Sequence, residues 1–330
     1  MAKIQVIQFG LGPIGAGVAR VIAGRSDFQI VGAVDIDPAK VGQDVGDVIG
    51  LGRKLGVKVS DDAAQTLKKK ANVVMHCTSS SLVKVEPELS AIIRAKHNIV
   101  STCEELAMPY VSKAGTRVAA RIDALAKKFK VTVLGTGINP GYMMDTLPIV
   151  LTGVCQQVNS IRVHRVVDAS KRRKPLQAKI GTGITVEEFK AKAGKQIRHV
   201  GLTESVAMVA KTMRWKLDKI EETIEPVVAK SVIKTQYFEV QPGFVTGVEQ
   251  YGWGYSKGQK VVELHLKMCV DAGESIDEVW LEGNPNIHSR IEGVHGDIST
   301  AAVAANCVRR VVAAEPGLVM MTDLPIISVG

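Results

Sequence analysis

The stretch Ile4-Gln-Val-Ile-Gln-Phe9, followed directly by Gly10-Leu-Gly12-Pro-Ile-Gly15, decides the fold of this chain. The apolar run predicts a buried strand, and the glycine-rich turn after it predicts a sharp entry into a helix. A second apolar run, Ile30-Val-Gly-Ala-Val34, ends in Asp35, 20 residues after Gly15. A strand, a glycine turn, a helix and a second strand that ends in an acid are typical of one dinucleotide-binding unit.

Each part of this unit has a physical role in holding a nucleotide. Gly10 allows the tight turn, Gly12 lets the backbone approach a pyrophosphate, and Gly15 lets helix and strand pack closely. The first-turn amides and the helix dipole bind the phosphates, and Asp35 can accept hydrogen bonds from ribose hydroxyls. The expected cofactor is NAD(H) or NADP(H), because Lys40 can soften the repulsion between Asp35 and a 2′-phosphate. The predicted contacts in this motif are Gly10, Leu11, Gly12, Pro13, Ile14, Gly15 and Asp35.

The composition is that of an ordinary globular protein with excess positive charge. The formal net charge is +9, but the basic residues are mostly dispersed and do not interleave with aromatic residues, which argues against nucleic-acid binding. No run of about 18 apolar residues could span a membrane, and the chain enters its first strand without a signal-peptide pattern, which predicts a cytoplasmic protein. The five cysteines lack paired spacing, so we expect reduced thiols and no metal site.

Two short basic runs, Lys68–Lys70 and Lys171–Lys174, stand out from this dispersed pattern. We interpret both as solvated surface charge. Contact with an anionic group is the alternative for the second run, because Lys179-Ile-Gly-Thr-Gly183 follows it closely.

The first half of the chain alternates apolar runs with helical patterns, which predicts a Rossmann-type, doubly wound parallel sheet. After Asp35 the expected strands are 57–59, 72–77, 98–102 and 131–134, and the expected helices are 61–70, 83–96 and 111–129. Ligands of such sheets bind beyond the carboxyl ends of the strands. The predicted cofactor contacts there are Cys77, Thr78, Ser79, Ser80, Thr102 and Asn139.

The second half predicts an α+β domain with a mixed or antiparallel sheet. Its expected strands are 160–167, 227–240, 260–270 and 275–281, and its expected helices, 185–193 and 203–217, each open with a capping threonine. The apolar helix 298–314 is expected to be buried, against the first domain or in a subunit interface. The predicted domains are 1–138 for the dinucleotide, with 297–330 packing back on it, and 139–296 for substrate binding and dimerisation.

Cys103-Glu104-Glu105 stands at the end of the strand expected at 98–102, next to where a nicotinamide ring would lie. Because side chains alternate across a strand, we expect one carboxylate to point into the cleft and its neighbour away. A carboxylate there can pair with an ammonium group or serve as general acid and base. The alternative is a helix that begins with acids because its dipole favours them.

Other polar residues on the expected cleft loops are candidates for substrate binding. Asn139-Pro-Gly-Tyr142 can supply an amide and a phenol, although a plain turn is the simpler explanation. The histidines lack metal-ligand spacing, and His295 lies in a loop placed to reach the cleft. The predicted substrate residues are Tyr142, His164, Gln177, Thr182 and His295.

With these motifs the chain resembles the 2,4-diaminopentanoate dehydrogenase and native amine dehydrogenase group of the dihydrodipicolinate reductase-like superfamily. The motifs behind the resemblance are Phe9–Gly15, Val34–Pro38, Ser101–Glu105, Gly135–Tyr142, Asp168–Arg173 with Pro175–Gln177, and Gly296–Asp297 with Thr300 and Asp323–Pro325. They span nearly the whole chain. The first two are common to many nicotinamide enzymes, whereas the Glu-Glu segment, the 168–177 stretch and the C-terminal motif are specific.

The resemblance implies an NAD(P)-dependent oxidative deamination of a small amine or diamine, or in reverse the reductive amination of a ketone or aldehyde with ammonia. An active-site glutamate handles the amine in such enzymes, a role that falls on Glu104 or Glu105. Related sugar-type dehydrogenases often carry the lysine of a Glu-Lys-Pro segment where this chain has Glu105, which hints at Glu105. The resemblance also implies a homodimer.

Two alternatives remain open. One is a dihydrodipicolinate reductase-like enzyme that reduces a cyclic imine or a carbonyl, and the other is a nucleotide-sensing scaffold without turnover. True dihydrodipicolinate reductases carry a paired-histidine and lysine motif, whereas this chain has His164-Arg165, and Lys171 lacks the expected surroundings. The apolar strands and cleft loops of the second domain count against a scaffold.

Overall fold

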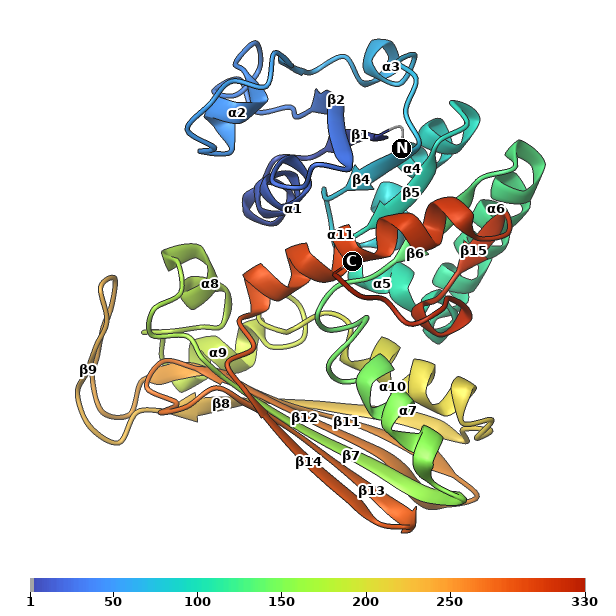
Figure 1. The fold of residues 1–330 in the computed structure, drawn as a ribbon. Coiled ribbons are helices and arrows are strands. Elements are labelled where there is room, and N and C mark those ends of the chain that lie inside the picture. Colours follow the sequence, from blue (N-terminus) through green and yellow to red (C-terminus); the bar gives the residue numbers. More distant parts are fainter. Residues whose placement is uncertain (1–2, 330) are drawn as a thin grey trace. The chain divides into compact units, whose positions relative to one another are not determined.

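The chain folds into two compact units. The computed structural model describes residues 3–329, and Met1, Ala2 and Gly330 lie outside that part of the chain. Unit 1 comprises Met1–Tyr142 with His295–Gly330, and unit 2 comprises Met143–Val294. The returning segment of unit 1 holds α11 (Gly296–Ala313) and β15 (Gly317–Val319), drawn in orange and red in Figure 1.

Unit 1 is built on a seven-stranded parallel sheet with the order β15-β6-β5-β4-β1-β2-β3. The strands are β1 (Ile4–Phe9), β2 (Phe28–Val34), β3 (Val59–Ser60), β4 (Val73–His76), β5 (Asn98–Ser101) and β6 (Thr132–Gly135), with β15 at the edge. The strand order reverses between β2 and β4, on either side of β1, which is where doubly wound sheets bind their ligands. The predicted Rossmann-type sheet is confirmed.

Helices cover both faces of this sheet. Helix α1 (Pro13–Ala23) packs with α11, and α4 (Leu82–Arg94) packs with α6 (Lys113–Phe129) (Figure 1). Leucine and isoleucine side chains at helical spacing, such as Leu89 and Ile93 of α4, join the strands in one core. The shorter elements are α2 (Val45–Val48), α3 (Ala63–Thr66), α5 (Glu104–Ala107), and the 3-10 turns η1 (Pro109–Val111) and η3 (Met321–Asp323).

Unit 2 is built on a six-stranded sheet with the order β14-β13-β7-β12-β11-β8. The strands are β7 (Gln157–Asp168), β8 (Lys219–Val228), β11 (Val245–Ser256), β12 (Gln259–Cys269), β13 (Ile276–Asn284) and β14 (Ile287–Glu292). β7 and β12 are parallel, and the other neighbours are antiparallel, so the predicted mixed sheet is confirmed. A separate hairpin joins β9 (Ile233–Lys234) to β10 (Glu239–Val240).

The two faces of the six-stranded sheet differ. On the inner face, aliphatic side chains pack against α10 (Leu202–Thr212) and α7 (Thr146–Leu151), which the turn η2 (Thr152–Val154) follows. The outer face carries polar and aromatic side chains, here defined as Arg162, His164, Glu249, Tyr251, Trp253, Glu263, His265, Lys267, Glu278, Trp280, His288, Arg290 and Glu292. Beside the sheet lie α8 (Lys174–Lys179) and α9 (Val186–Lys192), and α9 begins at the predicted cap Thr185, which forms a capping box with Glu188.

Three expected elements are corrected by the structure. The helix expected at 61–70 is a single turn, α3, because the three lysines after Leu67 are exposed and gain nothing from packing. Thr203 does not cap α10, which begins after Gly201 with a φ of 113°, a backbone conformation that suits glycine. The strand expected at 227–240 is instead the end of β8 followed by the β9–β10 hairpin.

The strands β11, β14 and β15 were not predicted. Glycines obscured β11, and the structure shows why they are needed there. A Cβ at Gly247 would lie 2.1 Å from the Met268 carbonyl oxygen, and one at Gly254 would lie 2.9 Å from Val206 of α10. The close approach of neighbouring backbone and helix therefore selects glycine within a strand.

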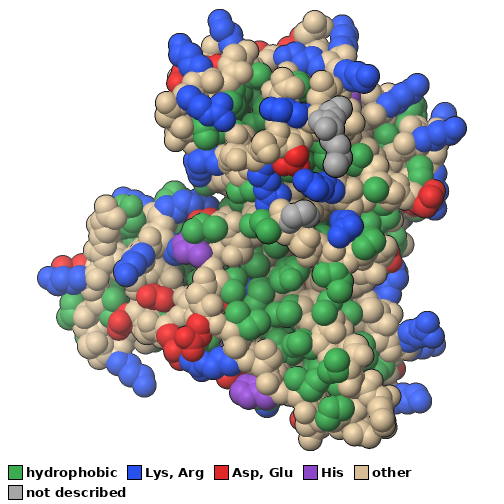
Figure 2. All heavy atoms as spheres, in the orientation of Figure 1, with side chains coloured by type: hydrophobic (Ala, Val, Ile, Leu, Met, Phe, Trp, Pro, Cys, Tyr) green, Lys and Arg blue, Asp and Glu red, His purple; other side chains and the backbone are tan. Residues whose placement is uncertain are grey.

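The surface agrees with the dispersed charge of the sequence. In Figure 2, lysine and arginine side chains are spread over the visible face in small groups. None of the helices within residues 3–329 combines the length and the apolar character that a membrane crossing needs.

Candidate active site

The glycine turn between β1 and α1 is shaped by contacts that a side chain would break. Gly10 has a φ of +87°, and a Cβ there would lie 2.4 Å from the Cys77 carbonyl oxygen. A Cβ at Gly15 would lie 2.0 Å from the Gly10 carbonyl oxygen, whereas Gly12 faces open space. Gly12 is also the N-cap of α1, and no side chain caps the amides of that first turn. The turn therefore fits a pyrophosphate held at a helix N-terminus.

Asp35 joins the end of β2 to this glycine turn. Its Oδ2 accepts a hydrogen bond from the Leu11 amide at 2.6 Å, and its Oδ1 accepts one from the Asp37 amide at 2.9 Å. The Lys40 ammonium group lies 3.4 Å from Asp35 and 3.1 Å from Asp37. Leu11 is buried, so its side chain packs in the core and its backbone faces the acid. A carboxylate that could accept hydrogen bonds from ribose hydroxyls therefore stands beside a cation that could pair with a 2′-phosphate.

Gln8, which is not among the predicted site residues, holds the same turn from within β1. Its side chain is fully buried, and its Nε2 donates to the carbonyl oxygens of Gly10 at 2.8 Å and Met75 at 3.3 Å. In the sequence, Gln8 is marked only by its polar side chain within an apolar run.

The loop after β4 is joined to the segment after β5. The Ser80 carbonyl oxygen accepts hydrogen bonds from the Glu105 amide at 3.3 Å and from the Cys103 thiol at 3.2 Å. The Thr102 amide donates to the His76 carbonyl oxygen at 2.9 Å. The structure therefore brings the predicted loop, Thr102 and the two acids together at the carboxyl edge of the sheet.

Glu104 and Glu105 form the first turn of helix α5, so the expectation that they alternate across a strand is wrong. β5 ends at Ser101, and α5 begins at Glu104 after the N-cap Cys103. The helical alternative is correct, and acids are favourable at that position because of the helix dipole. Glu105 Oε2 also accepts a hydrogen bond from the amide of Leu82, the first residue of α4, at 2.8 Å. Glu105 thereby satisfies one of the unpaired amides at the start of α4.

A buried histidine at this edge is a second residue that is not among the predicted site residues. His76, the last residue of β4, lies between Ser101 Oγ at 2.9 Å from its Nδ1 and Glu88 Oε2 at 2.8 Å from its Nε2. The Thr78 hydroxyl donates to the same Glu88 oxygen at 2.7 Å. Burial raises the pKa of Glu88, but the hydrogen bonds to His76 and Thr78 outweigh burial and lower it.

The remaining candidates of unit 1 lie near the two points where the chain passes between the units, after residue 142 and before residue 295. Asn139 is buried shortly after β6, and Tyr142 is half-buried at the end of the first segment. His295 is exposed at the N-cap position of α11, where its carbonyl oxygen accepts the Ser299 amide at 2.8 Å.

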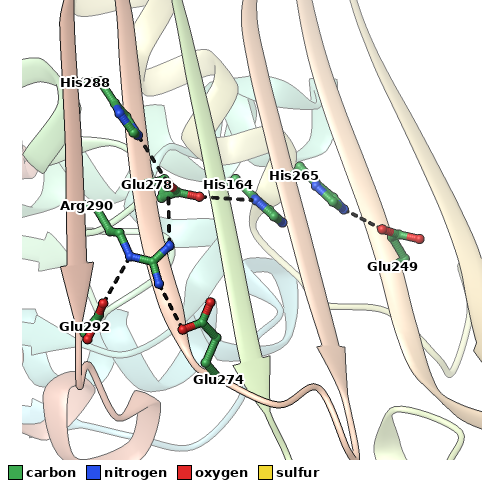
Figure 3. Close-up of polar contacts among 8 residues, drawn as sticks. All are labelled: His164, Glu249, His265, Glu274, Glu278, His288, Arg290 and Glu292. Atoms are coloured by element: carbon green, nitrogen blue, oxygen red, sulfur yellow. Dashed lines mark hydrogen bonds and ion pairs between the residues drawn. The ribbon is translucent and has the colours of Figure 1, made fainter.

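His164 lies on the outer face of unit 2, in a row of rings that crosses the strands. It stacks on His265 with ring centroids 4.3 Å apart, and His265 stacks on Tyr251 at 4.1 Å. Figure 3 shows His164 beside Glu278, at 3.9 Å, and His265 bonded to Glu249, at 2.7 Å. Burial lowers the pKa of both imidazoles, and their mutual repulsion lowers that of His164 further.

Gln177 and Thr182 are buried elsewhere in unit 2. The Gln177 Nε2 donates to the carbonyl oxygens of Ala169, Ser170 and Arg172, and its Oε1 accepts from the Thr235 hydroxyl. The Thr182 hydroxyl donates to the Thr246 carbonyl oxygen at 3.1 Å. Among residues 3–329, no hydrogen bond joins either residue to His164, so these three candidates are not brought together.

The basic run Lys171–Lys174 is not uniformly solvated, so the interpretation as a surface charge run is wrong for Arg172, which is 7% exposed. Arg165, 3% exposed, pairs with Asp277 on the next strand at 2.9 Å. Burial lowers the pKa of Arg165, and repulsion from Arg172 lowers it further. The attraction of Asp277 raises this pKa but does not outweigh the burial. Burial also raises the pKa of Asp277 to about 6. Unit 2 therefore holds two buried guanidinium groups that repel each other.

The cysteines and acids do not gather into a metal centre within residues 3–329. The five cysteines are free thiols. Burial raises the pKa of Cys77 and Cys269 to about 11, so both remain protonated at neutral pH.

The chain as a whole is similar to known dehydrogenases. Residues 142–329 match the 2,4-diaminopentanoate dehydrogenase C-terminal domain, and residues 4–104 match the dihydrodipicolinate reductase N-terminus. The chain is 35% identical to 2,4-diaminopentanoate dehydrogenase of Acetoanaerobium sticklandii over 99% of its length and 94% of that protein. It is 24% identical to an amine dehydrogenase of Streptomyces virginiae over 98% of its length and 96% of that protein. Its structure resembles that of amine dehydrogenase from Mycobacterium smegmatis, with a TM-score of 0.87, 26% identity, and coverage of 99% of this chain and 97% of that one.

Proposed function

Because the chain belongs to the 2,4-diaminopentanoate dehydrogenase family, and is thus an NAD(P)-dependent oxidoreductase acting on CH–NH2 donors, we propose that it oxidatively deaminates a small amine or diamine. The reverse reaction is the reductive amination of a ketone or aldehyde with ammonia. The observation that carries the proposal is a pair of acids at the carboxyl edge of a dinucleotide-binding sheet, in a chain matched by amine dehydrogenases along its whole length.

The residues of the glycine turn and of β2 fit the nicotinamide cofactor. The open Gly12 and the first-turn amides of α1 would hold the pyrophosphate, and Asp35 would hold the ribose. The loop Cys77–Ser80, Thr102 and Asn139 would border the nicotinamide. The bound cofactor supplies the hydride chemistry, and the protein residues orient it and exclude water.

We assign the catalytic role to Glu104 rather than Glu105. The carboxylate of Glu105 accepts the Leu82 amide and caps α4, so its position serves the fold. Glu104 stands one residue earlier, at the first position of α5, where the chain leaves β5 toward the cofactor edge. This assignment reverses the hint that the sequence comparison with sugar-type dehydrogenases gave.

The proposed chemistry needs one carboxylate in three successive roles. As hydride leaves the carbon that bears nitrogen, positive charge develops on that nitrogen, and the Glu104 carboxylate stabilises it. Glu104 then takes a proton from water as the water oxygen bonds to the iminium carbon. It returns that proton to nitrogen, and it takes the hydroxyl proton of the carbinolamine as the carbon–nitrogen bond breaks, which releases ammonia and leaves a carbonyl.

The outer face of unit 2 supports a homodimer. It presents rings and charges of both signs, with Glu249, Glu263 and Glu278 among Arg162, Lys267 and Arg290, so a two-fold related copy can match opposite charges. Tyr251→Glu should convert a dimer of 35.4 kDa chains into a monomer in light scattering, whereas Val154→Glu, at an exposed site off the sheet, should not. A monomeric wild-type chain would contradict the homodimer. The free thiols fit a cytoplasmic location.

The central test is amine-dependent formation of reduced cofactor, followed by its absorbance with NAD and with NADP. Glu104→Gln should lower kcat by about 10²- to 10⁴-fold while NADH still binds, and Glu105→Gln should retain most activity. Near-normal turnover by Glu104→Gln would contradict the assignment. In reverse, NADH oxidation must require both a carbonyl compound and ammonia. Oxidation without ammonia would identify a carbonyl or imine reductase, and NADH binding without any turnover would identify a nucleotide sensor.

A further inference from the structure

We propose that His76 is a positioning residue that sets the acid segment Cys103–Glu105 through Ser101, and the Thr78 loop through Glu88. The inference rests on the proposed function, because the segment that it positions carries Glu104. His76 is fully buried at the end of β4, beneath both segments, and its two ring nitrogens bond side chains on opposite sides.

One arrangement of protons satisfies every atom of this network. The Cys103 amide donates to Ser101 Oγ at 3.1 Å, and the Ser101 hydroxyl can then donate to His76 Nδ1. The remaining ring N–H, on Nε2, donates to Glu88 Oε2. Thr78 donates its own hydroxyl proton to that same oxygen, and its Oγ1 lies 3.0 Å from His76 Nε2 as a second acceptor for the ring N–H. The chain of donors thus runs in one direction, from the start of α5 to a carboxylate on α4, and Glu88 fixes the tautomer of His76.

The network joins two loops, and the proposed reaction depends on the position of one relative to the other. Ser101 lies at the end of β5, and its hydroxyl fixes the amide of Cys103, the residue before Glu104. Thr78 lies in the loop proposed to border the cofactor, and Glu88 holds it from α4. His76 is the group between them. A displacement of about 1 Å at α5 would move the carboxylate away from the reacting nitrogen, which can lower the rate about 100-fold.

A second buried histidine of unit 1 offers a contrast. His97 is 4% exposed, and both of its ring nitrogens lie against backbone carbonyl oxygens, those of Leu67 at 2.9 Å and Ala71 at 3.1 Å. These partners precede β4 at the amino edge of the sheet, away from the proposed reaction. His97 therefore serves as a matched control for the loss of a buried imidazole.

The test uses two substitutions that each keep one half of the network. Asn places its amide near the position of Nδ1, so His76→Asn keeps the partner of Ser101 and loses Glu88. Gln reaches the position of Nε2, so His76→Gln keeps Glu88 and loses Ser101. We expect His76→Gln to lower kcat about 10- to 100-fold with little change in KM for NAD(P). We expect His76→Asn to raise KM for the cofactor about tenfold and to retain most of kcat.

A readout that does not depend on activity accompanies the kinetics. Hydrogen exchange of the peptide that contains the Cys103 amide should become at least about tenfold faster in His76→Gln than in wild type. His97→Gln should leave both kcat and this exchange rate unchanged, even where its thermal stability falls.

Each outcome has a defined meaning. Wild-type kcat, KM and exchange in both His76 variants would overturn the proposal. Equal losses of kcat in His76→Gln and His97→Gln would also overturn it, because the effect would then follow stability alone. A wild-type chain that binds NADH but oxidises no amine would contradict the proposed function, and the exchange experiment would still decide whether His76 positions the segment.

Discussion

The carboxyl edge of the seven-stranded sheet and the six-stranded sheet of unit 2 hold their polar side chains in different ways. At the carboxyl edge, apart from the His76 network, side chains bond mainly to backbone groups, as Asp35 does to the Leu11 amide and Glu105 to the Leu82 amide. Along the six-stranded sheet, side chains bond mainly to side chains, as Arg165 does to Asp277 and His265 to Glu249. A bond to the backbone fixes the shape of a loop, whereas a bond between side chains fixes the pairing of strands. Substitutions should therefore affect binding in the first region and stability in the second.

The largest expected effect on stability is in unit 2. Arg165→Ala would leave the Asp277 carboxylate buried without its partner, which should lower the free energy of unfolding by about 3–5 kcal/mol. Arg290→Ala, which removes exposed ion pairs with Glu274 and Glu292, should lower it by less than about 1 kcal/mol. Urea titration of both variants checks this difference. Similar losses would show that burial does not separate the two pairs.

The next largest effect is at the glycine turn. Gly15→Ala would force the Gly10 carbonyl group to move, which should cost about 1–3 kcal/mol of unfolding free energy and reduce NADH binding. Gly12→Ala meets no neighbouring atom, so it should change stability by less than about 0.5 kcal/mol and still weaken NADH binding. Chemical unfolding of the cofactor-free protein, with NADH fluorescence titration, separates these outcomes. A stable Gly15→Ala variant with normal affinity would refute the steric argument.

A smaller effect concerns the choice of cofactor. Asp35 repels a 2′-phosphate, and the Lys40 ammonium group beside it attracts one. Asp35→Ala should shift the affinity ratio of NAD to NADP about tenfold toward NADP, which corresponds to about 1.4 kcal/mol. Unchanged relative affinities in paired titrations would show that Asp35 is not the ribose ligand.

The smallest expected effect is a dependence on pH that differs between the regions. Burial holds the pKa of His164 and His265 below the usual 6.5, so the neutral imidazoles stabilise the fold above that value. This stability should be lost as pH falls below about 6.5, because the unfolded chain then binds more protons. Burial raises the pKa of Glu88 but its hydrogen bonds lower it overall, so its contribution persists to more acidic pH. The difference between the unfolding free energies at pH 7.5 and 5.5 should become smaller in His265→Gln, and an unchanged difference would contradict this origin.

The same contrast explains how far the sequence could be interpreted. In a parallel sheet, successive strand ends meet at one edge, so the order of motifs along the chain predicted which loops would lie together. That argument placed the glycine turn, Asp35 and the Cys77–Ser80 loop with Glu104 and Glu105. It could not show that Glu105 caps α4, because the Leu82 amide lies 23 residues away in sequence and on another element.

Unit 2 was less predictable because its pairs are distant in sequence. His164 and His265 become neighbours only through the parallel pairing of β7 with β12, and Arg165 meets Asp277 only through β13. Alternation along β7 predicted two faces but not which of them carries the histidine. The burial of Arg172 had no sequence signal within its basic run, since the Gln177 amide that bonds its carbonyl oxygen is visible only in three dimensions.

The hydrogen bond from Leu11 to Asp35 has a practical consequence for redesign of this protein. An engineer who exchanges the acid for a neutral or basic residue to change coenzyme preference also removes the acceptor that braces the phosphate-binding loop. A substitution of Asp35 therefore changes both the coenzyme preference and the rigidity of the phosphate-binding loop. Asparagine, which discards the negative charge and retains an oxygen for the amide, is the replacement that would separate them.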